Sequence, residues 1–243
     1  VSGYVGRFKS RVRTEGEEIE IEHGAVVVAT GARAMTPSEY LYGQDARVVT
    51  QQELEERLAS GDSSLGIRDS SLVTMIQCVG SRDDKHAYCS RICCQQAIKN
   101  ALKLRELNPK AQIVVLYRDI RAYGFKEDVY RAAREQGVLF LPYESDGKPK
   151  VESVDGKLRV TANAVFAPDG KIEFAPDLVV LSAGIEPNDN APLAQLLKVP
   201  LTQDGFFLEA HAKLRPLDFA ADGIFLAGLA HSPRTLEESI AQA

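Results

Sequence analysis

The sequence contains no apolar run long enough to cross a bilayer, and its first residues do not form a signal peptide. It also contains no cluster of basic side chains, because 29 Lys and Arg residues are outnumbered by 34 Asp and Glu residues. We therefore expect no transmembrane segment and no nucleic-acid partner, since phosphate contacts need concentrated positive charge. A cytoplasmic globular protein that binds small molecules and other proteins is the prediction that remains.

Cysteine is scarce and confined to one short segment. The 243 residues include four cysteines, which follow the spacing C-x10-C-x3-C-C and are Cys78, Cys89, Cys93 and Cys94. Because thiols stay reduced in the cytoplasm, such a group favours metal binding or redox chemistry over structural disulfides. Four thiolates can ligate one four-iron cluster, and Arg82 and Arg91 would offset its negative charge.

Two alternatives use the same four residues. A structural zinc site also takes four cysteines, although it usually has two separated C-x2-C pairs. A thiol–disulfide centre usually has a C-x-x-C pair, which this sequence lacks, and adjacent cysteines form strained bridges. The spacing therefore favours an iron–sulfur cluster without excluding zinc.

The phosphate-binding motif G-x-G-x-x-G is absent from the whole sequence. In the middle of the chain, a strand over residues 72–78, a helix after the cysteines and a strand over residues 112–117 form a right-handed crossover with parallel strands. A nucleotide-binding domain carries its glycines at the first turn of this unit, where the sequence has Cys78-Val79-Gly80-Ser81. We therefore expect no NAD(P) at this turn.

The remaining pattern predicts an α/β protein with a Rossmann-like middle unit. We expect that unit to span residues 65–184, after a linker over residues 61–71, and to be inserted between two flanking parts, residues 1–64 and 185–243. Other predicted elements are a hairpin over residues 4–22, strands over residues 25–28, 138–141, 151–154, 157–165, 178–181, 206–209 and 224–227, and helices that begin after Thr50, at Lys126 and at Leu236.

Two strand ends rich in small residues lie on either side of the middle unit. They are Ala29-Thr30-Gly31 and Gly223-Ile224-Phe225-Leu226-Ala227-Gly228. Small residues at a strand end let a cofactor approach the backbone, so this pair resembles the two halves of a flavin domain around an insert. Two other features receive simpler interpretations: residues 118–121 as a solvated charge cluster, and His231 as a hydrogen-bonded loop residue.

The cysteine segment, Tyr117-Arg118-Asp119-Ile120-Arg121 and residues 223–228 together resemble the A-subunit family of heterodisulfide reductase. They are also similar to the flavoprotein subunit of the quinone-interacting membrane-bound oxidoreductase. The resemblance implies a thioredoxin-reductase-like fold, FAD, and a four-iron cluster on the four cysteines. It also implies cofactor contacts from a set of small and backbone-contacting residues: Thr30, Gly31, Gly228, Leu229, Ala230, Ser239 and Ile240.

The resemblance further implies an oxidoreductase that relays electrons between FAD and the iron–sulfur clusters of partner subunits. The glycine loop that holds the FAD pyrophosphate in such proteins is absent, and the sequence stops inside a helical pattern at Ala243. We therefore expect a fragment with an incomplete FAD site that is inactive when isolated, and that associates with other electron-transfer subunits or as a homodimer. The alternatives are a zinc-stapled docking module and an NAD(P)H-dependent disulfide reductase.

Overall fold

A computed structural model describes residues 1–61, 66–68, 70–144, 147–164, 167 and 170–243. The chain forms two compact units. The middle unit is Met35–Gly184, and the outer unit combines Val1–Ala34 with Ile185–Ala243. Within the described ranges, no helix has both the length and the apolar character needed to span a membrane.

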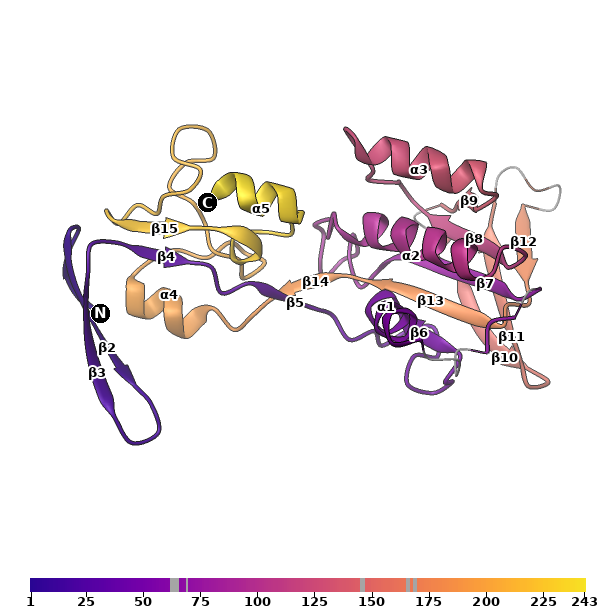
Figure 1. Cartoon of the computed structure of the whole chain (residues 1–243), viewed down its shortest axis with the longest axis horizontal. Coiled ribbons are helices and arrows are strands. Elements are labelled where there is room, and N and C mark those ends of the chain that lie inside the picture. Colours follow the sequence, from indigo (N-terminus) through magenta and orange to yellow (C-terminus); the bar gives the residue numbers. More distant parts are fainter. Residues whose placement is uncertain (62–65, 69, 145–146, 165–166, 168–169) are drawn as a thin grey trace. The chain divides into compact units, whose positions relative to one another are not determined.

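The middle unit is built on a five-stranded sheet (Figure 1). All four strand pairs are parallel, which confirms the predicted crossover. In spatial order the strands are β6 (Val48–Thr50), β13 (Leu178–Ala183), β7 (Leu72–Val79), β8 (Gln112–Tyr117) and β9 (Leu139–Pro142). The successive strands β7, β8 and β9 run outward to one side, and β13 then returns to the other side of β7.

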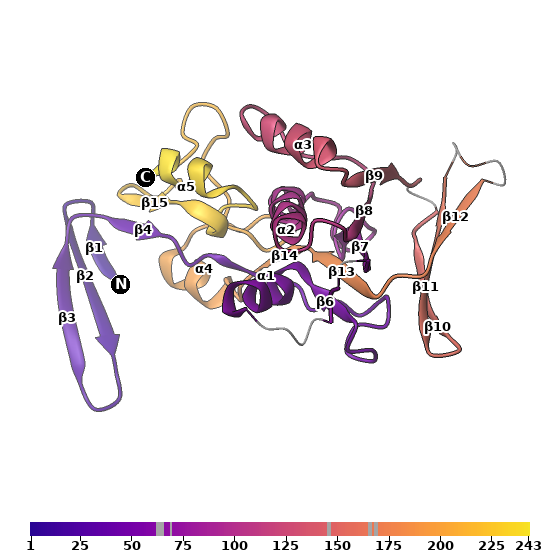
Figure 2. The ribbon, with the colours of Figure 1, turned by 45° about the vertical axis from the view of Figure 1, so that its right-hand side comes forward.

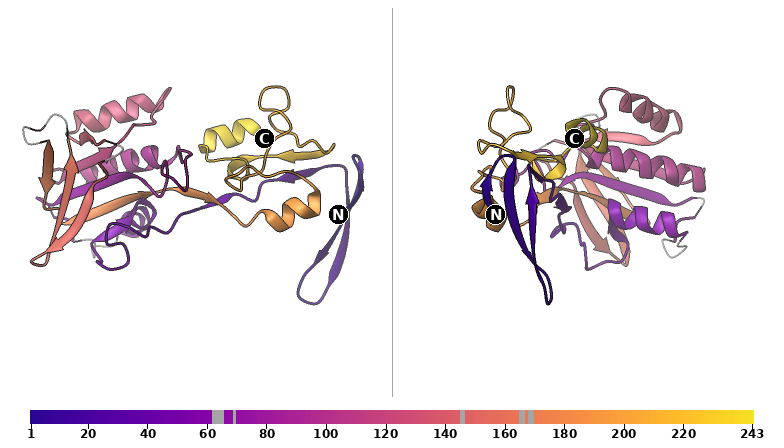
Figure 3. Two further views of the ribbon diagram at one scale, coloured as in Figure 1. Left: turned by 180° about the vertical axis from the view of Figure 1, so that it is seen from behind. Right: turned by 60° about the vertical axis from the view of Figure 1, so that its left-hand side comes forward.

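Three helices cover one face of this sheet (Figure 3). They are α1 (Gln51–Ser60), α2 (Cys93–Leu107) and α3 (Lys126–Glu135). The α1 helix begins where the sequence predicts, because the Thr50 side chain accepts from the Glu53 N–H and the Glu53 side chain accepts from the Thr50 N–H. The apolar sides of the three helices share one core with β7, β8 and β13.

A second, three-stranded sheet covers the other face (Figure 2). It is antiparallel and consists of β10 (Lys150–Val154), β11 (Lys157–Asn163) and β12 (Lys171–Phe174). The first two strands confirm the predicted hairpin at Asp155-Gly156, where both residues have a positive φ. The predicted end of the second strand, Val165, lies outside the described residues, as does part of the predicted linker, residues 62–65 and 69.

The outer unit joins the two ends of the chain. A meander of β1 (Ser2–Tyr4), β2 (Arg7–Arg13) and β3 (Glu18–His23) contains the predicted hairpin. The short strands β4 (Val26–Val28) and β15 (Ile224–Leu226) pair in parallel, and β5 (Ala32–Ala34) pairs with β14 (Ile185–Pro187) in antiparallel. The helical segments are α4 (Ala191–Leu197), the 3-10 turn η2 (Gly228–Ala230) and α5 (Leu236–Gln242).

Two expectations differ from the observed architecture. The sequence placed the first boundary after residue 64, whereas the two units separate after Ala34. The reason is that β6 pairs within the sheet of the middle unit and α1 packs against that sheet. The predicted strand over residues 206–209 is wrong. The Phe206 N–H bonds to the Thr202 side chain and the Phe207 N–H to the Ala230 carbonyl, so only an isolated bridge to Leu201 forms there.

Candidate functional site

The cysteine segment lies at the carboxyl end of β7. The strand order reverses between β7 and β13, and open α/β sheets bind ligands beside such a switch point. The loop packs tightly there, since a Cβ atom on Gly184 would lie 3.1 Å from the carbonyl oxygen of Gly80. This position is where a Rossmann-like domain places its functional loop.

Three elements carry the four cysteines. Cys78 is the second-to-last residue of strand β7, and Cys89 is in the loop that follows. Cys93 and Cys94 are the first residues of α2. The α2 helix begins at Cys93, so Cys89 lies outside it. All four are free thiols, and all except Cys89 are buried.

The three buried cysteines have shifted pKa values. Burial, together with negative charge on Cys94 and Cys89, raises the pKa of Cys78 to about 11. The pKa of Cys93 lies well above its usual value because its thiol donates to Cys94 and because it is buried. The same bond, with Arg121 and Arg82, lowers the pKa of Cys94 to about 7. Of the three buried thiols, Cys94 therefore ionises most readily.

The backbone of this segment is strained. Cys78, Arg82 and Arg91 have φ values of 62°, 58° and 59°, a left-handed conformation that favours glycine. The β7–β13 register also shifts at this level, between Leu181 and Ala183. Strain of this kind costs about 1–3 kcal/mol per residue and persists where the surrounding structure enforces it, as at ligand sites.

Charged side chains hold the cysteine loop in place. Arg82 lies 2.8 Å from the carboxylate of Asp119, and Arg118 donates to the Arg82 carbonyl at 2.6 Å. Arg121 lies 3.7 Å from the same carboxylate. The interpretation of residues 118–121 as a merely solvated cluster is therefore wrong, because these side chains join the end of β8 to the cysteine loop.

The donor set fits a cluster that takes sulfur ligands. In the part of the chain that the structure describes, no three His, Cys, Asp or Glu side chains already have the arrangement of a metal site. Four free thiols nevertheless lie in one segment, three of them buried, beside two arginines and the N-terminus of α2, which favour thiolates. Next to Cys78, the fully buried Gln77 amide has no hydrogen-bond partner among the described residues. Sequence reasoning missed Gln77, although an amide within a mostly apolar strand is a visible signal.

The outer unit brings the two small-residue motifs to one edge. The pairing of β4 with β15 is parallel, and the Ala227 N–H continues it by bonding to the Val28 carbonyl. The residues that follow, Thr30-Gly31 and Gly228, therefore leave from the same end of the strand pair. Gly31 has a φ of 76° with open space where a side chain would lie, and the Thr30 carbonyl accepts from Asn188.

The other expected cofactor contacts follow Gly228 in the chain. Leu229 and Ala230 lie in η2, and Ala230 is fully buried. Ser239 and Ile240 lie inside α5, three and four residues after it begins at Leu236, so they are not at its N-terminus. Ser239 still faces the glycine turn, since its Oγ lies 3.9 Å from the position of a Cβ on Gly228.

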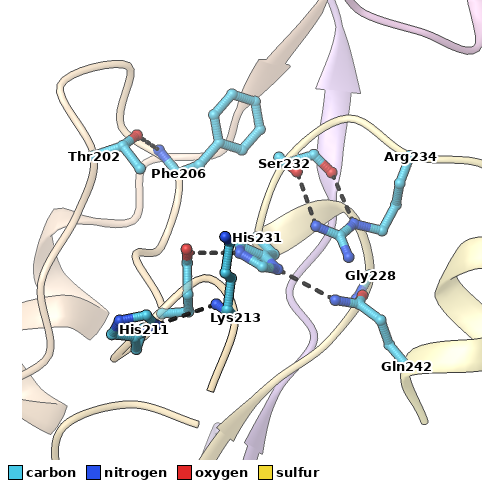
Figure 4. A network of polar contacts seen from close by, with 10 residues as sticks. Thr202, Phe206, His211, Lys213, Gly228, His231, Ser232, Arg234 and Gln242 are labelled. Atoms are coloured by element: carbon cyan, nitrogen blue, oxygen red, sulfur yellow. Dashed lines mark hydrogen bonds and ion pairs between the residues drawn. The ribbon is translucent and has the colours of Figure 1, made fainter. Parts of the chain in front are cut away.

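A chain of hydrogen bonds fixes this turn (Figure 4). The Gly228 N–H donates to Gln242 Oε1 at 2.8 Å, and Gln242 Nε2 lies 3.2 Å from His231 Nδ1. His231 Nε2 lies 2.8 Å from Glu209 Oε2. The Gln242 amide can donate to Nδ1 only if the imidazole is neutral, and burial lowers the pKa of His231. His231 is thus the hydrogen-bonded residue that the sequence suggests, and Gln242 is a contact that the sequence did not reveal.

Comparison with known proteins identifies the family. Over 94% of its length the chain is 38% identical to the A-subunit of the H(2):CoB-CoM heterodisulfide,ferredoxin reductase of Methanothermobacter marburgensis. It is 39% identical, over 93% of its length, to the iron-sulfur A-subunit of the CoB–CoM heterodisulfide reductase of Methanocaldococcus jannaschii. This chain belongs to the A-subunit family of heterodisulfide reductase. It spans 37% and 36% of the length of these two relatives.

Solved structures show the fold of this family member. The HOCl-induced flavoprotein disulfide reductase RclA of Escherichia coli matches 99% of the chain, which covers 47% of that protein, with a TM-score of 0.55 and 13% identity. The thioredoxin reductase of T. acidophilum matches 96% of the chain, which covers 68% of that protein, with a TM-score of 0.55 and 10% identity. The predicted thioredoxin-reductase-like fold is therefore confirmed. No family model matches the chain.

Proposed function

We propose that this part of a heterodisulfide reductase relative binds one four-iron cluster through Cys78, Cys89, Cys93 and Cys94, and relays electrons between FAD and partner subunits. The observation that carries the proposal is that all four cysteines are free thiols in one segment at the carboxyl end of β7, and that three of them are buried. Cysteine thiolates are the usual ligands of such clusters, and four are sufficient. When bound, the cluster would accept and donate single electrons.

The residues around the thiols have supporting roles. Arg82 and Arg121 supply positive charge near Cys94, and they stabilise the thiolate that ligation requires. Asp119 holds Arg82 in place through their 2.8 Å ion pair. Burial of three of the four sulfurs excludes water, which protects a cluster from hydrolysis and oxidation. Cys89, the partly exposed member, marks the side from which a partner can approach.

The outer unit supports an FAD site in part. Gly31 leaves backbone open for a close approach, and Thr30 and Gly228 leave the same end of the β4–β15 pair. The Gly228 N–H is already bonded to Gln242, so the other residues at this turn would contact the cofactor. These are Leu229, Ser239 and Ile240, while the buried Ala230 would contribute only its backbone. The pyrophosphate-binding glycine loop is not within this sequence. These residues therefore form one side of a flavin site.

The proposed partners are other electron-transfer subunits. The names of the two relatives describe them as A-subunits of reductases that act on a CoB–CoM heterodisulfide. For this chain we propose the same class of substrate and association with other subunits of such a reductase. A homodimer and a cytoplasmic location are further parts of the proposal. The ordinary net charge of −5 agrees with protein partners and with no nucleic-acid partner.

Elemental analysis after anaerobic purification tests the proposal. We expect about four iron and four sulfide per chain, as one four-iron cluster requires. A Cys93→Ser variant should lose most of this iron, whereas His86→Ala, in the same loop, should keep it. A colourless protein with one zinc and no sulfide would contradict the cluster and favour a zinc-stapled docking module. Saturable binding of NADH or NADPH would favour a disulfide reductase.

A further inference from the structure

Gln77 is an unusual residue for the middle of a sheet. It lies in β7 directly before Cys78, and its side chain is completely buried. Neither its Nε2 nor its Oε1 atom has a hydrogen-bond partner among the described residues. Its backbone carbonyl is satisfied by the Tyr143 hydroxyl at 2.9 Å, so the deficit belongs to the amide alone. A buried polar group without a partner is costly, and such groups in native proteins usually mark a missing water or ligand.

The strand pattern indicates where this amide points. Alternate residues of a strand face the same side, and Met75 packs in the core beneath the helices, so Gln77 faces the helices as well. In a parallel crossover the helix after a strand starts above the carboxyl end of that strand. The first turn of α2, which begins with Cys93 and Cys94, therefore lies above Gln77.

The neighbouring polar groups on this face do not need Gln77. Asn100 of α2 donates to the Gln51 side chain at 2.9 Å, and the Gln51 amide donates to Ser182 Oγ at 3.3 Å. Ser182 lies beside Gln77 in the adjacent strand, between the paired positions Leu181 and Ala183. These three residues bond to one another, so they leave the buried Gln77 amide on the helix side of β7 without a partner among the described residues.

We propose that the Gln77 amide donates a hydrogen bond from Nε2 to a sulfur of the cluster. The inference rests on the proposed function and assigns to that site a residue that is not one of its ligands. A hydrogen bond to sulfur stabilises the more negative, reduced state of a cluster more than the oxidised state. Gln77 therefore raises the reduction potential of the cluster, and it acts as a positioning and tuning residue without contacting a substrate.

The test compares two substitutions in the same buried strand. Gln77→Met keeps the volume of the side chain and removes the amide. Thr74→Val removes another buried group that has no partner among the described residues, but Thr74 faces the opposite side of the sheet. In redox titrations of anaerobically purified protein followed by electron paramagnetic resonance, we expect the midpoint potential to become more negative in Gln77→Met and to stay unchanged in Thr74→Val. Equal potentials in wild type and Gln77→Met would overturn the proposal.

A second measurement remains available if Gln77→Met does not fold. Gln95, next to Cys94, also has an amide nitrogen that lacks a partner within the described ranges. The second variant is therefore Gln95→Met, which keeps Gln77 and removes this other amide. With glutamine labelled at the side-chain amide with nitrogen-15, the reduced cluster should show a nitrogen-15 hyperfine coupling. A cluster without this coupling would mean that buried water satisfies Gln77.

The two hypotheses fail in different ways. Protein that contains no iron and no sulfide contradicts the proposed function, and this inference with it. Protein that contains a complete cluster, but whose potential and hyperfine spectrum do not depend on Gln77, contradicts only the inference.

Discussion

The Arg82 guanidinium lies 2.8 Å from the carboxylate of Asp119, and this ion pair joins the cysteine loop to the chain that follows β8. The Arg82 side chain is 20% exposed, so the pair is less screened by water than an ordinary surface pair. A second bond, from Arg118 to the Arg82 carbonyl, fixes the same residue from its backbone. The shape of the loop therefore depends on residues far away in the sequence.

Replacing Asp119 should destabilise the middle unit. We expect Asp119→Asn to lower the free energy of unfolding by about 1 kcal/mol, because Arg82 loses its charged partner while remaining partly buried. Urea denaturation of the metal-free protein measures this loss. The matched control is Asp128→Asn, which breaks the exposed Asp128–Arg131 pair on α3 and should change stability by less than about 0.5 kcal/mol. Equal effects in both variants would show that the loop does not depend on Asp119.

Replacing Asn100 should have a larger effect. Its amide donates to both the backbone and the side chain of Gln51, and the residue is 2% exposed. Asn100→Ala leaves these buried acceptors without a donor, so we expect a loss of about 2 kcal/mol in the free energy of unfolding. Lys103→Ala, on the exposed side of the same helix, should cost less than about 0.5 kcal/mol. A loss below that of Lys103→Ala would mean that the polar chain beneath α2 adds no stability.

The stability of the outer unit should depend on pH through His231. Burial lowers the pKa of His231 in the folded protein, so the unfolded chain binds the proton more tightly. Stability is therefore highest above the ordinary pKa, about 6.5, and falls as the pH drops through this value toward the lower folded pKa. Burial alone would raise the pKa of Glu209, but a backbone hydrogen bond and His231 outweigh it and lower that pKa, so Glu209 stays ionised in this range.

A His231→Gln variant separates this effect from other titrations. It should show a flatter change in unfolding free energy between pH 7.5 and pH 5.5 than wild type, on the scale on which about one pKa unit corresponds to about 1.4 kcal/mol. Leu214→Ala serves as the control, since Leu214 is an exposed residue of the same unit whose side chain does not titrate, so the slope should stay unchanged. Parallel curves for wild type and His231→Gln would exclude the effect.

Removing the proposed cluster should weaken the middle unit. Ligands that bind only the folded state stabilise it, and four cysteines in β7, the loop and α2 would be released together. We expect oxidative removal of iron to lower the Tm by on the order of 10 °C, a change that calorimetry detects easily. The same treatment should leave the Tm of Cys93→Ser unchanged. An unchanged Tm in the wild type would show that the cysteines are not linked through iron.

Local sequence signals predicted much of the fold because each acts over a few residues. The Thr50–Glu53 capping box placed the start of α1, and Asp155-Gly156 placed the turn between β10 and β11. The apolar runs gave β7 and β8, and the loop and helix between them gave their parallel pairing. The ligation of one cluster by the four cysteines stays a prediction, since the described residues contain no group of three or more potential ligands already arranged around a metal.

The features that the sequence did not predict depend on contacts between residues far apart in the chain. The sequence of residues 48–50 is too short to show that it pairs with residues 179–181, so the position of β6 and the unit boundary were not foreseen. Phe206 looks like a strand residue but bonds to a threonine side chain. The Arg82–Asp119 pair and the Gly228–Gln242 bond likewise connect residues whose proximity only the fold reveals.

The place of β13 has a consequence for how the protein is made. This strand pairs on both sides, with β6 and with β7, yet it is synthesised after every other strand of the sheet. Until Leu178–Ala183 leaves the ribosome, one edge of β7 has unpaired N–H and C=O groups, and such an edge promotes association with other chains. Pairings between distant segments also form slowly. Cys78 at the end of β7 is thus translated before the strand that completes the sheet on that side.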